Sequence, residues 1–296
     1  MSQPFILSCE STVDMPYSRV SARNIPVLFY TYSVDGETYI DDMLRDAQAL
    51  PRFYAMLEAG KLPTTTQVNA CQYKEFFAEQ LRRGDLLHIT LGTGMTQSYQ
   101  NALMAAQELR EEFPHRRIIV VDSLCSSSGY GMLLECAADL RDSGHTMEQI
   151  EQWLLENRGL VHHQFFSTEL KHYRRSGRMS GATAMIATVL NICPIMRLDD
   201  RGRIIAYSKI RGKKNAVNLT VQTMLEHAQN GADYSGKCCI CHSQCLADAQ
   251  LLRQSVLAQF PNLKDVPIFD IGTSIAAHCG PGTCAVFFFG TPRTPE

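Results

Sequence analysis

Short apolar runs alternate with longer amphipathic segments along the first half of the chain. The runs predict strands that are apolar enough to be buried on both faces, at residues 5–9, 27–32, 86–91 and 118–121. The segments between them carry helical periodicity, at residues 48–59, 73–82, 97–113 and 127–141. Alternation of this kind is typical of a parallel sheet with flanking helices.

The second half of the chain has a different pattern. It predicts strands at residues 161–166, 195–198, 203–210 and 237–241, and helices at residues 182–190, 216–229 and 246–259. The turn Asp199-Asp200-Arg201-Gly202 joins two of these strands as a hairpin, so their sheet contains an antiparallel pair. We therefore expect an α/β protein with a mixed sheet and helices in this half, and a disordered tail from Thr291 to Glu296.

Size and composition limit the class of protein. A chain of 296 residues exceeds what one core usually supports, which favours two α/β domains, 1–160 and 161–292. The net charge of −2 argues against a nucleic-acid-binding protein, and no apolar run approaches the ~20 residues that cross a bilayer. Since no secretion signal is visible, the eleven cysteines predict reduced thiols in the cytoplasm.

Three turns are rich in hydroxyl groups. Residues 91–99 (LGTGMTQSY) join a predicted strand to a helix, where glycines and free N–H groups suit a carboxylate or a phosphate. Residues 62–67 contain three adjacent threonines, and residues 9–16 (CESTVDMP) follow the first strand. Ordinary helix capping is the alternative for each turn. The 91–99 turn also lacks the third glycine of a dinucleotide site and the lysine of a P-loop.

Basic residues and a histidine add to this picture. Glycines on both sides of Arg178 let its guanidinium approach a carboxylate or a phosphate, whereas Arg174 and Arg175 are expected to be solvated. The basic group around Arg211 is either functional or an exposed helix start. The tight turn His278-Cys279-Gly280-Pro281-Gly282 is expected to fix its histidine beside a cavity.

The cysteines and histidines elsewhere do not predict a metal site. Cys238, Cys239 and Cys241 lack both the spacing and the second pair that zinc sites use, so we interpret them as buried strand residues. His162 and His163 lie in a strand pattern and are interpreted as structural. No nucleophile elbow of a serine hydrolase occurs, and no pair of carboxylates stands out as acid and base.

Taken together and in order, these turns resemble the DegV family of fatty-acid-binding proteins over nearly the whole chain. The similar segments are Glu10–Pro16, Thr65–Asn69, Gly92–Tyr99, Ser176–Ser180 and Ala276–Gly282. The chain departs from the family pattern where Gly92 replaces a serine, Glu10 replaces an aspartate, and Ala276-Ala277 replace Gly-Thr before the histidine.

The resemblance implies two α/β domains with one long-chain fatty acid between them. The carboxylate-binding residues carried over to this chain are Thr65 and Thr93, with Thr66, Thr96 and His278 beside them, and the acyl chain enters the second domain. Arg178 and Arg211 are expected to face the phosphate or the kinase.

The implied role is that of a carrier and not an enzyme. A separate fatty acid kinase phosphorylates the bound acid, and the carrier delivers acyl phosphate to phospholipid synthesis. No cofactor other than the bound acid is expected, and we expect a monomer or weak dimer with transient membrane contact. The alternative is an enzyme of related architecture, similar to dihydroxyacetone kinases, that uses His278 on a small carbonyl or phosphate compound. A protein that only mediates interactions, with neither ligand nor turnover, is a third alternative.

Overall fold

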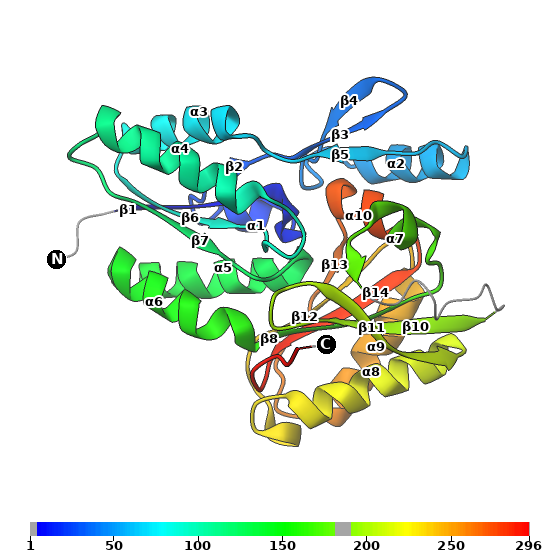
Figure 1. Cartoon of the computed structure of the whole chain (residues 1–296). Helices are drawn as coiled ribbons and strands as arrows, with labels where there is room; N and C mark the ends of the chain where they lie inside the picture. Colours follow the sequence, from blue (N-terminus) through cyan, green and yellow to red (C-terminus); the bar gives the residue numbers. More distant parts are fainter. Residues whose placement is uncertain (1–4, 181–190, 296) are drawn as a thin grey trace.

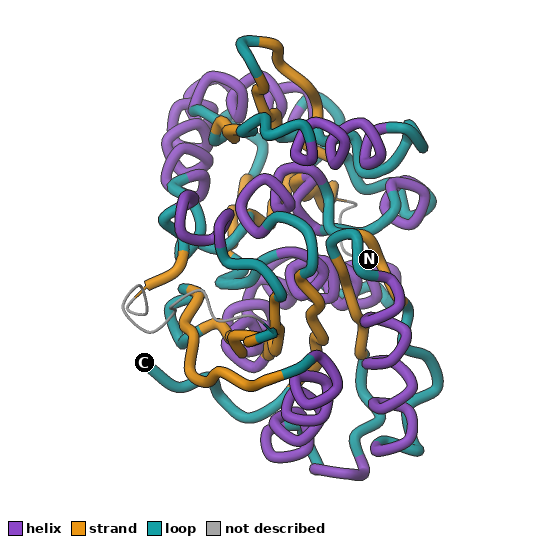
Figure 2. The backbone as a smooth tube through the Cα atoms, turned by 90° about the vertical axis from the view of Figure 1, so that its right-hand side faces the viewer, coloured by secondary structure: helices purple, strands orange, loops and turns teal. Residues whose placement is uncertain are grey.

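The computed structural model describes residues 5–180 and 191–295, which form an α/β fold with three sheets (Figure 1). The predicted helix 182–190 lies outside the described residues. Both ribbon views show the β3–β4 hairpin projecting at one end of the molecule (Figures 1 and 2). Among the described helices, none has the length and apolar character needed to cross a bilayer.

The first sheet is parallel, as the alternating pattern predicted. Its order is β2-β1-β6-β7, built from β1 (Phe5–Glu10), β2 (Val27–Leu28), β6 (Asp85–Thr90) and β7 (Ile118–Asp122). Every residue of β6 is buried, because helices cover both faces of the sheet. Helices α3 (Ala70–Leu81) and α4 (Ser98–Glu112) lie on one side, and α5 (Ser127–Asp142) and α6 (Met147–Asn157) lie on the other (Figure 1).

The predicted strand 27–32 is wrong in its extent, because the chain changes sheets within it. After β2, the Tyr30 N–H donates to Ser11 Oγ (3.0 Å), and the Tyr30 carbonyl accepts the Asp41 N–H (2.9 Å). The chain then enters a small antiparallel sheet of order β4-β3-β5. Its parts are β3 (Thr31–Val34), β4 (Glu37–Ile40) and β5 (Thr64–Thr66), with α2 (Ala49–Glu58) beside them; η1 (Ser11–Val13) and α1 (Tyr17–Ser21) precede β2.

The third sheet is mixed, in agreement with the prediction for the second half. Its order is β13-β12-β14-β8-β10-β11-β9, and only the β12–β13 and β9–β11 pairs are parallel. The strands are β8 (Val161–Ser167), β9 (Met179–Ser180), β10 (Ile192–Leu198), β11 (Ile204–Arg211), β12 (Cys238–His242), β13 (Ile268–Asp270) and β14 (Thr283–Phe289). The β10–β11 hairpin is confirmed, as is the burial of the cysteines on β12.

Helices line both faces of the mixed sheet. The two long ones, α8 (Lys213–His227) and α9 (Leu246–Gln259), lie below it in Figure 1, while the short α7 (Lys171–Ser176) and α10 (Thr273–Cys279) lie above. The 3-10 turns η2 (Arg158–Leu160) and η3 (Gly231–Asp233) complete the set. Neither α7 nor α10 was predicted, because helices this short show little periodicity.

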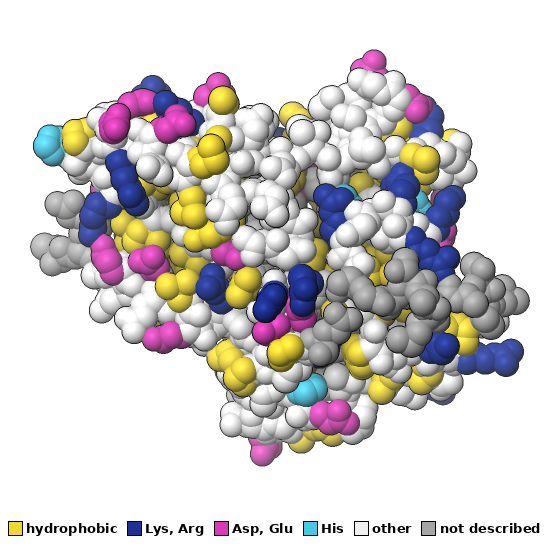
Figure 3. Space-filling model, in the orientation of Figure 1, with side chains coloured by type: hydrophobic (Ala, Val, Ile, Leu, Met, Phe, Trp, Pro, Cys, Tyr) yellow, Lys and Arg dark blue, Asp and Glu magenta, His cyan; other side chains and the backbone are white. Residues whose placement is uncertain are grey.

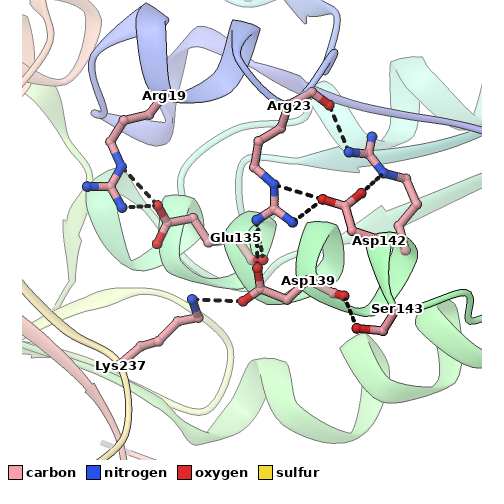
Figure 4. A network of polar contacts seen from close by, with 8 residues as sticks. Arg19, Arg23, Glu135, Asp139, Asp142, Ser143 and Lys237 are labelled. Atoms are coloured by element: carbon pink, nitrogen blue, oxygen red, sulfur yellow. Dashed lines mark hydrogen bonds and ion pairs between the residues drawn. The ribbon is translucent and has the colours of Figure 1, made fainter.

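Helix α5 is shared by the two halves of the chain. It packs under the parallel sheet and also contacts β8, β12 and β14 of the mixed sheet. Figure 4 shows the ionic network along its exposed face, in which Asp139 pairs with both Arg23 (2.7 Å), after α1, and Lys237 (2.9 Å), before β12. Arg19 pairs with Glu135 one turn earlier (2.5 Å). The two halves are therefore tied through one helix.

The tail from Thr291 is ordered as far as it is described, which corrects the prediction of disorder. Arg293 is only 6% exposed, and its Nη2 donates to the carbonyls of Leu124 (2.9 Å) and Arg158 (3.3 Å). The tail therefore anchors the loop after β7 to the η2 turn through one guanidinium group. Its Thr-Pro-Arg-Thr-Pro composition gave no sign of this anchor.

Candidate functional site

A cavity with a volume of about 110 Å³ lies where the three sheets meet. Hydroxyl groups and a histidine line part of it, namely Thr12, Thr65, Thr96, Ser274 and His278. Apolar side chains from the mixed sheet line another part, namely Phe165, Leu198, Ile204, Ala285 and Phe287. The wall therefore combines a polar region with an apolar one.

The polar region lies at the carboxyl ends of the parallel strands. Thr12 follows β1 and Thr96 follows β6, and these two strands are neighbours in the sheet. Ligands of open α/β sheets commonly bind at this edge, because the loops there converge. Thr12 Oγ1 and Ser274 Oγ are buried and have no hydrogen-bond partner within the described structure. Two buried hydroxyls without partners in a cavity wall are candidate ligand contacts.

Helix α10 brings His278 to this region. His278 lies in the last turn of the helix, one turn after Ser274, and its Nε2 is 2.7 Å from Thr65 Oγ1 on β5. Burial, together with the nearby cations Arg178 and Arg175, lowers the pKa of His278 to about 4. The imidazole is therefore neutral at physiological pH. Its buried Nδ1 has no partner among the described residues.

Carboxyl groups hold the amino-terminal end of α10. Asp14 Oδ1 accepts the Gly272 N–H (2.9 Å), and Asp41 Oδ2 accepts the Ser274 N–H (3.3 Å). Burial raises the pKa of both carboxyls, that of Asp41 to about 6. A negative charge or a polar oxygen at this end complements the helix dipole. The register of His278 is thus set from the start of its helix.

Helix α7 holds the other end of α10. Arg175 Nη2 donates to the Ala277 carbonyl (3.1 Å). The sequence predicted a merely solvated side chain at Arg175, and this contact corrects that prediction. The His172 ring lies so close to Gly280 that a Cβ there would come within 2.2 Å of it. Gly280 also has φ +66°, which disfavours other residues. The glycine after His278 is therefore required by packing as well as by backbone conformation.

The predicted site residues fall into two groups. The structure brings Thr65, Thr96, His278 and Arg178 to the cavity wall. Thr93 is not in that wall: its hydroxyl and N–H donate to the Asp122 carboxylate at 2.7 and 3.1 Å. Thr66 is also outside the wall and exposed, because neighbouring residues of a strand point to opposite faces.

Two other residues singled out from the sequence, Arg211 and Gly92, lie outside the cavity wall. Arg211, at the end of β11, is exposed and does not line the cavity. Gly92, which departs from the family pattern, lies against the backbone of residue 125, where a Cβ would come within 2.8 Å of Cys125 N. A serine does not fit at this position without a shift of the loop.

Several residues in the wall were missed from the sequence. Thr12 lies in a turn already noted for its hydroxyls, and Ser274 precedes His278 by four residues, the spacing that puts two residues on one helix face. Tyr30 and Gln67 gave no such signal, because their approach to the cavity depends on the small antiparallel sheet.

Two cysteines in the wall are poor candidates for covalent chemistry. Burial raises the pKa of Cys279 to about 12 and that of Cys241 well above its ordinary value. Since the thiolate is the nucleophilic form, both remain unreactive thiols near neutral pH. The cavity is better suited to binding than to thiol catalysis.

The fold and the cavity define an α/β protein that can enclose a small molecule between a parallel and a mixed sheet. A family model for DegV proteins, described as uncharacterised, matches residues 7–291. A DegV domain-containing protein of Clostridium perfringens is 31% identical over 293 residues, which is 98% of this chain and 99% of that protein. The chain therefore belongs to the DegV family, as its motifs suggested.

Solved structures agree with this assignment. A fatty-acid-binding DegV family protein of Thermus thermophilus is 25% identical with a TM-score of 0.85, covering 97% of this chain and 99% of its own. A protein of Thermotoga maritima with a fatty acid binding function is 21% identical with a TM-score of 0.81, covering 97% and 99%. The two-domain DegV fold is confirmed.

Proposed function

We propose that this protein binds one long-chain fatty acid, with its carboxylate at Thr12, Thr65, Thr96, Ser274 and His278 and its acyl chain against the apolar wall. The cavity that combines these two walls is the observation that carries the proposal. The fatty-acid-binding relative from Thermus thermophilus supports it. Thr93 has a different role in this proposal, since its hydroxyl is engaged by Asp122.

The free energies of apolar burial and of hydrogen bonding differ, and they give the two walls different roles. Burial of an acyl chain is worth about 0.8 kcal/mol per methylene, whereas each neutral hydrogen bond contributes about 1 kcal/mol. The apolar wall therefore supplies most of the affinity. The carboxylate still requires donors, because an unpaired charge in a buried site is costly. The hydroxyls and the neutral imidazole orient the head group.

We further propose that the protein is a carrier that presents the carboxylate to a separate fatty acid kinase for acyl-phosphate formation. Arg178 both lines the cavity and is exposed, so it connects the head group with the surface. Figure 3 shows Lys and Arg side chains gathered over the part of the molecule where α7 lies. Arg211 would belong to the same kinase-facing surface. These cations suit a phosphorylated head group or an acidic partner.

We also infer how the two halves of the carrier divide the ligand contacts and where in the cell the carrier acts. Residues 1–160 would supply most of the head-group contacts, and residues 161–292 the acyl-chain wall. All eleven cysteines are free, and a cytoplasmic location accords with that state. The carrier would act in phospholipid synthesis as a monomer or weak dimer that contacts the membrane transiently.

Mass spectrometry of the ligand tests this proposal directly. Purified protein is denatured, and the released small molecules are extracted and identified. We expect close to one long-chain acid per chain. A small carbonyl or phosphate compound would instead favour an enzyme that uses His278, and protein that neither carries nor binds any such molecule would contradict both functions.

A further inference from the structure

A chain of hydroxyl groups connects the cavity wall to a buried carboxyl group. Thr96 Oγ1 lies 3.0 Å from Ser98 Oγ, Ser98 Oγ lies 2.6 Å from Tyr30 Oη, and Tyr30 Oη lies 3.2 Å from Glu10 Oε2. Thr96 and Tyr30 line the cavity, whereas Ser98 and Glu10 are fully buried behind them. The three hydroxyls form a continuous path from a ligand at Thr96 to Glu10.

The remaining contacts of Glu10 are already filled by other donors. Tyr73 donates to Oε1, and the Leu91 N–H donates to Oε2 (2.8 Å). The titratable groups that face Glu10 are Cys9, Tyr30, Tyr73, His88 and Tyr130; His88 Nε2 is 3.8 Å from Oε1, and Tyr130 Oη accepts the Glu10 N–H. Burial, assisted by Glu10, raises the pKa of Tyr30 and Tyr73, so both phenols keep their protons.

The number of protons in this path can be counted. A carboxylate ligand at Thr96 creates a chain of five oxygen sites, with gaps at ligand–Thr96, Thr96–Ser98, Ser98–Tyr30 and Tyr30–Glu10. Three hydroxyls supply one proton each to these four gaps; the Ser98 N–H also donates to Thr96 Oγ1 (3.2 Å), but this proton lies outside the gaps between oxygens. If the ligand and Glu10 are both ionised, one gap holds two oxygens with no proton between them. Such a contact is unfavourable in a buried site.

We propose that Tyr30 and Ser98 are positioning residues that couple the ligand carboxylate to Glu10, and that the carboxylate binds together with one proton. This inference rests on the proposed function. The proton comes from the buffer acid and completes the four-gap chain between Glu10 and the ligand. No other bond forms or breaks.

The coupling gives the binding reaction a defined pH dependence. Because one proton is taken up with the ligand, the affinity falls as the pH rises, by up to about tenfold per pH unit. Ser98→Ala divides the path into two parts, ligand–Thr96 and Tyr30–Glu10. Each part then has one gap and one hydroxyl proton, so the need for an extra proton disappears. Tyr30→Phe has the same consequence, since two protons then serve two gaps.

Titration calorimetry measures the proton directly. Delipidated full-length protein is titrated with oleate near neutral pH in phosphate and in Tris, which differ in ionisation enthalpy. We expect about one proton taken up per oleate by the wild type, and close to none by Ser98→Ala and Tyr30→Phe. Ser128→Ala is the matched control: this buried serine donates only to the Asp14 carbonyl (2.9 Å) and lies outside the cavity wall. It should keep the wild-type proton uptake.

The outcomes separate this inference from the function on which it rests. Oleate that binds to the wild type without proton uptake overturns the coupling and leaves the proposed function intact. Uptake that persists in both Ser98→Ala and Tyr30→Phe overturns it as well, because the proton must then be held outside the hydroxyl chain. Failure of the wild type to bind any long-chain acid would contradict the proposed function itself.

Discussion

The two walls of the cavity are built in different ways. The apolar wall consists of side chains on adjacent strands, as with Phe165 on β8 and Ala285 on β14, which face each other in the sheet register. The polar wall consists of single residues from loops, a short strand and a short helix, as with Thr96, Thr65 and His278. A sheet can set the shape of a cavity, whereas the convergence of loops sets its chemistry.

The largest expected effect lies at the apolar wall. Ala285→Phe places a ring in the cavity, and we expect the affinity for oleate to fall by more than about 100-fold, because the lost acyl-chain burial exceeds any one polar contact. Calorimetric titration of delipidated protein measures it. Ala232→Phe, on the exposed η3 turn, is the control and should bind normally. Near-normal affinity of Ala285→Phe would mean that the acyl chain lies elsewhere.

The next effect lies where a loop of the polar wall meets the β10–β11 hairpin. A Cβ on Gly94 would come within 2.2 Å of the Gly202 carbonyl, so Gly94→Ala forces the two backbones apart. We expect the free energy of unfolding to fall by about 3 kcal/mol, as urea denaturation measures. Gly159→Ala, whose Cβ would meet nothing within 4 Å, is the control. Equal stability of the two variants would show that the hairpin contact is not tight.

The same contrast explains what the sequence could and could not predict. Strands such as β6 and β8 carry their burial in their own residues, so their apolar runs were sufficient to locate them. The resemblance to the family located Thr65 and His278, but their 2.7 Å contact joins residues 213 positions apart. The placement of Tyr30 and the diversion of Thr93 to Asp122 depend on which loops meet, and local pattern contains no such information.

A third effect concerns the buried carboxyl at the start of α10. The folded-state pKa of Asp41 is raised to about 6 from an ordinary 3.8, so protonation favours the folded state. Its contribution to stability is complete below about pH 4 and is lost as the pH rises through about 6, with an upper limit of roughly 3 kcal/mol. Asp41→Asn should flatten the pH dependence of the free energy of unfolding in this range, as urea denaturation between pH 4 and 7 measures. Asp265→Asn, an exposed control, should leave it unchanged. An unaltered pH profile in Asp41→Asn would contradict the shift.

The smallest effect is expected at the head group itself. Thr65→Val removes the hydroxyl that contacts His278 Nε2 and one donor for the carboxylate. We expect the oleate affinity to fall only threefold to tenfold, because a neutral hydrogen bond contributes about 1 kcal/mol net. Thr64→Val, on the exposed face of β5, is the matched control and should retain full affinity. A loss comparable with that of Ala285→Phe would reverse the division of labour, since the polar wall would then supply the affinity as well as the orientation.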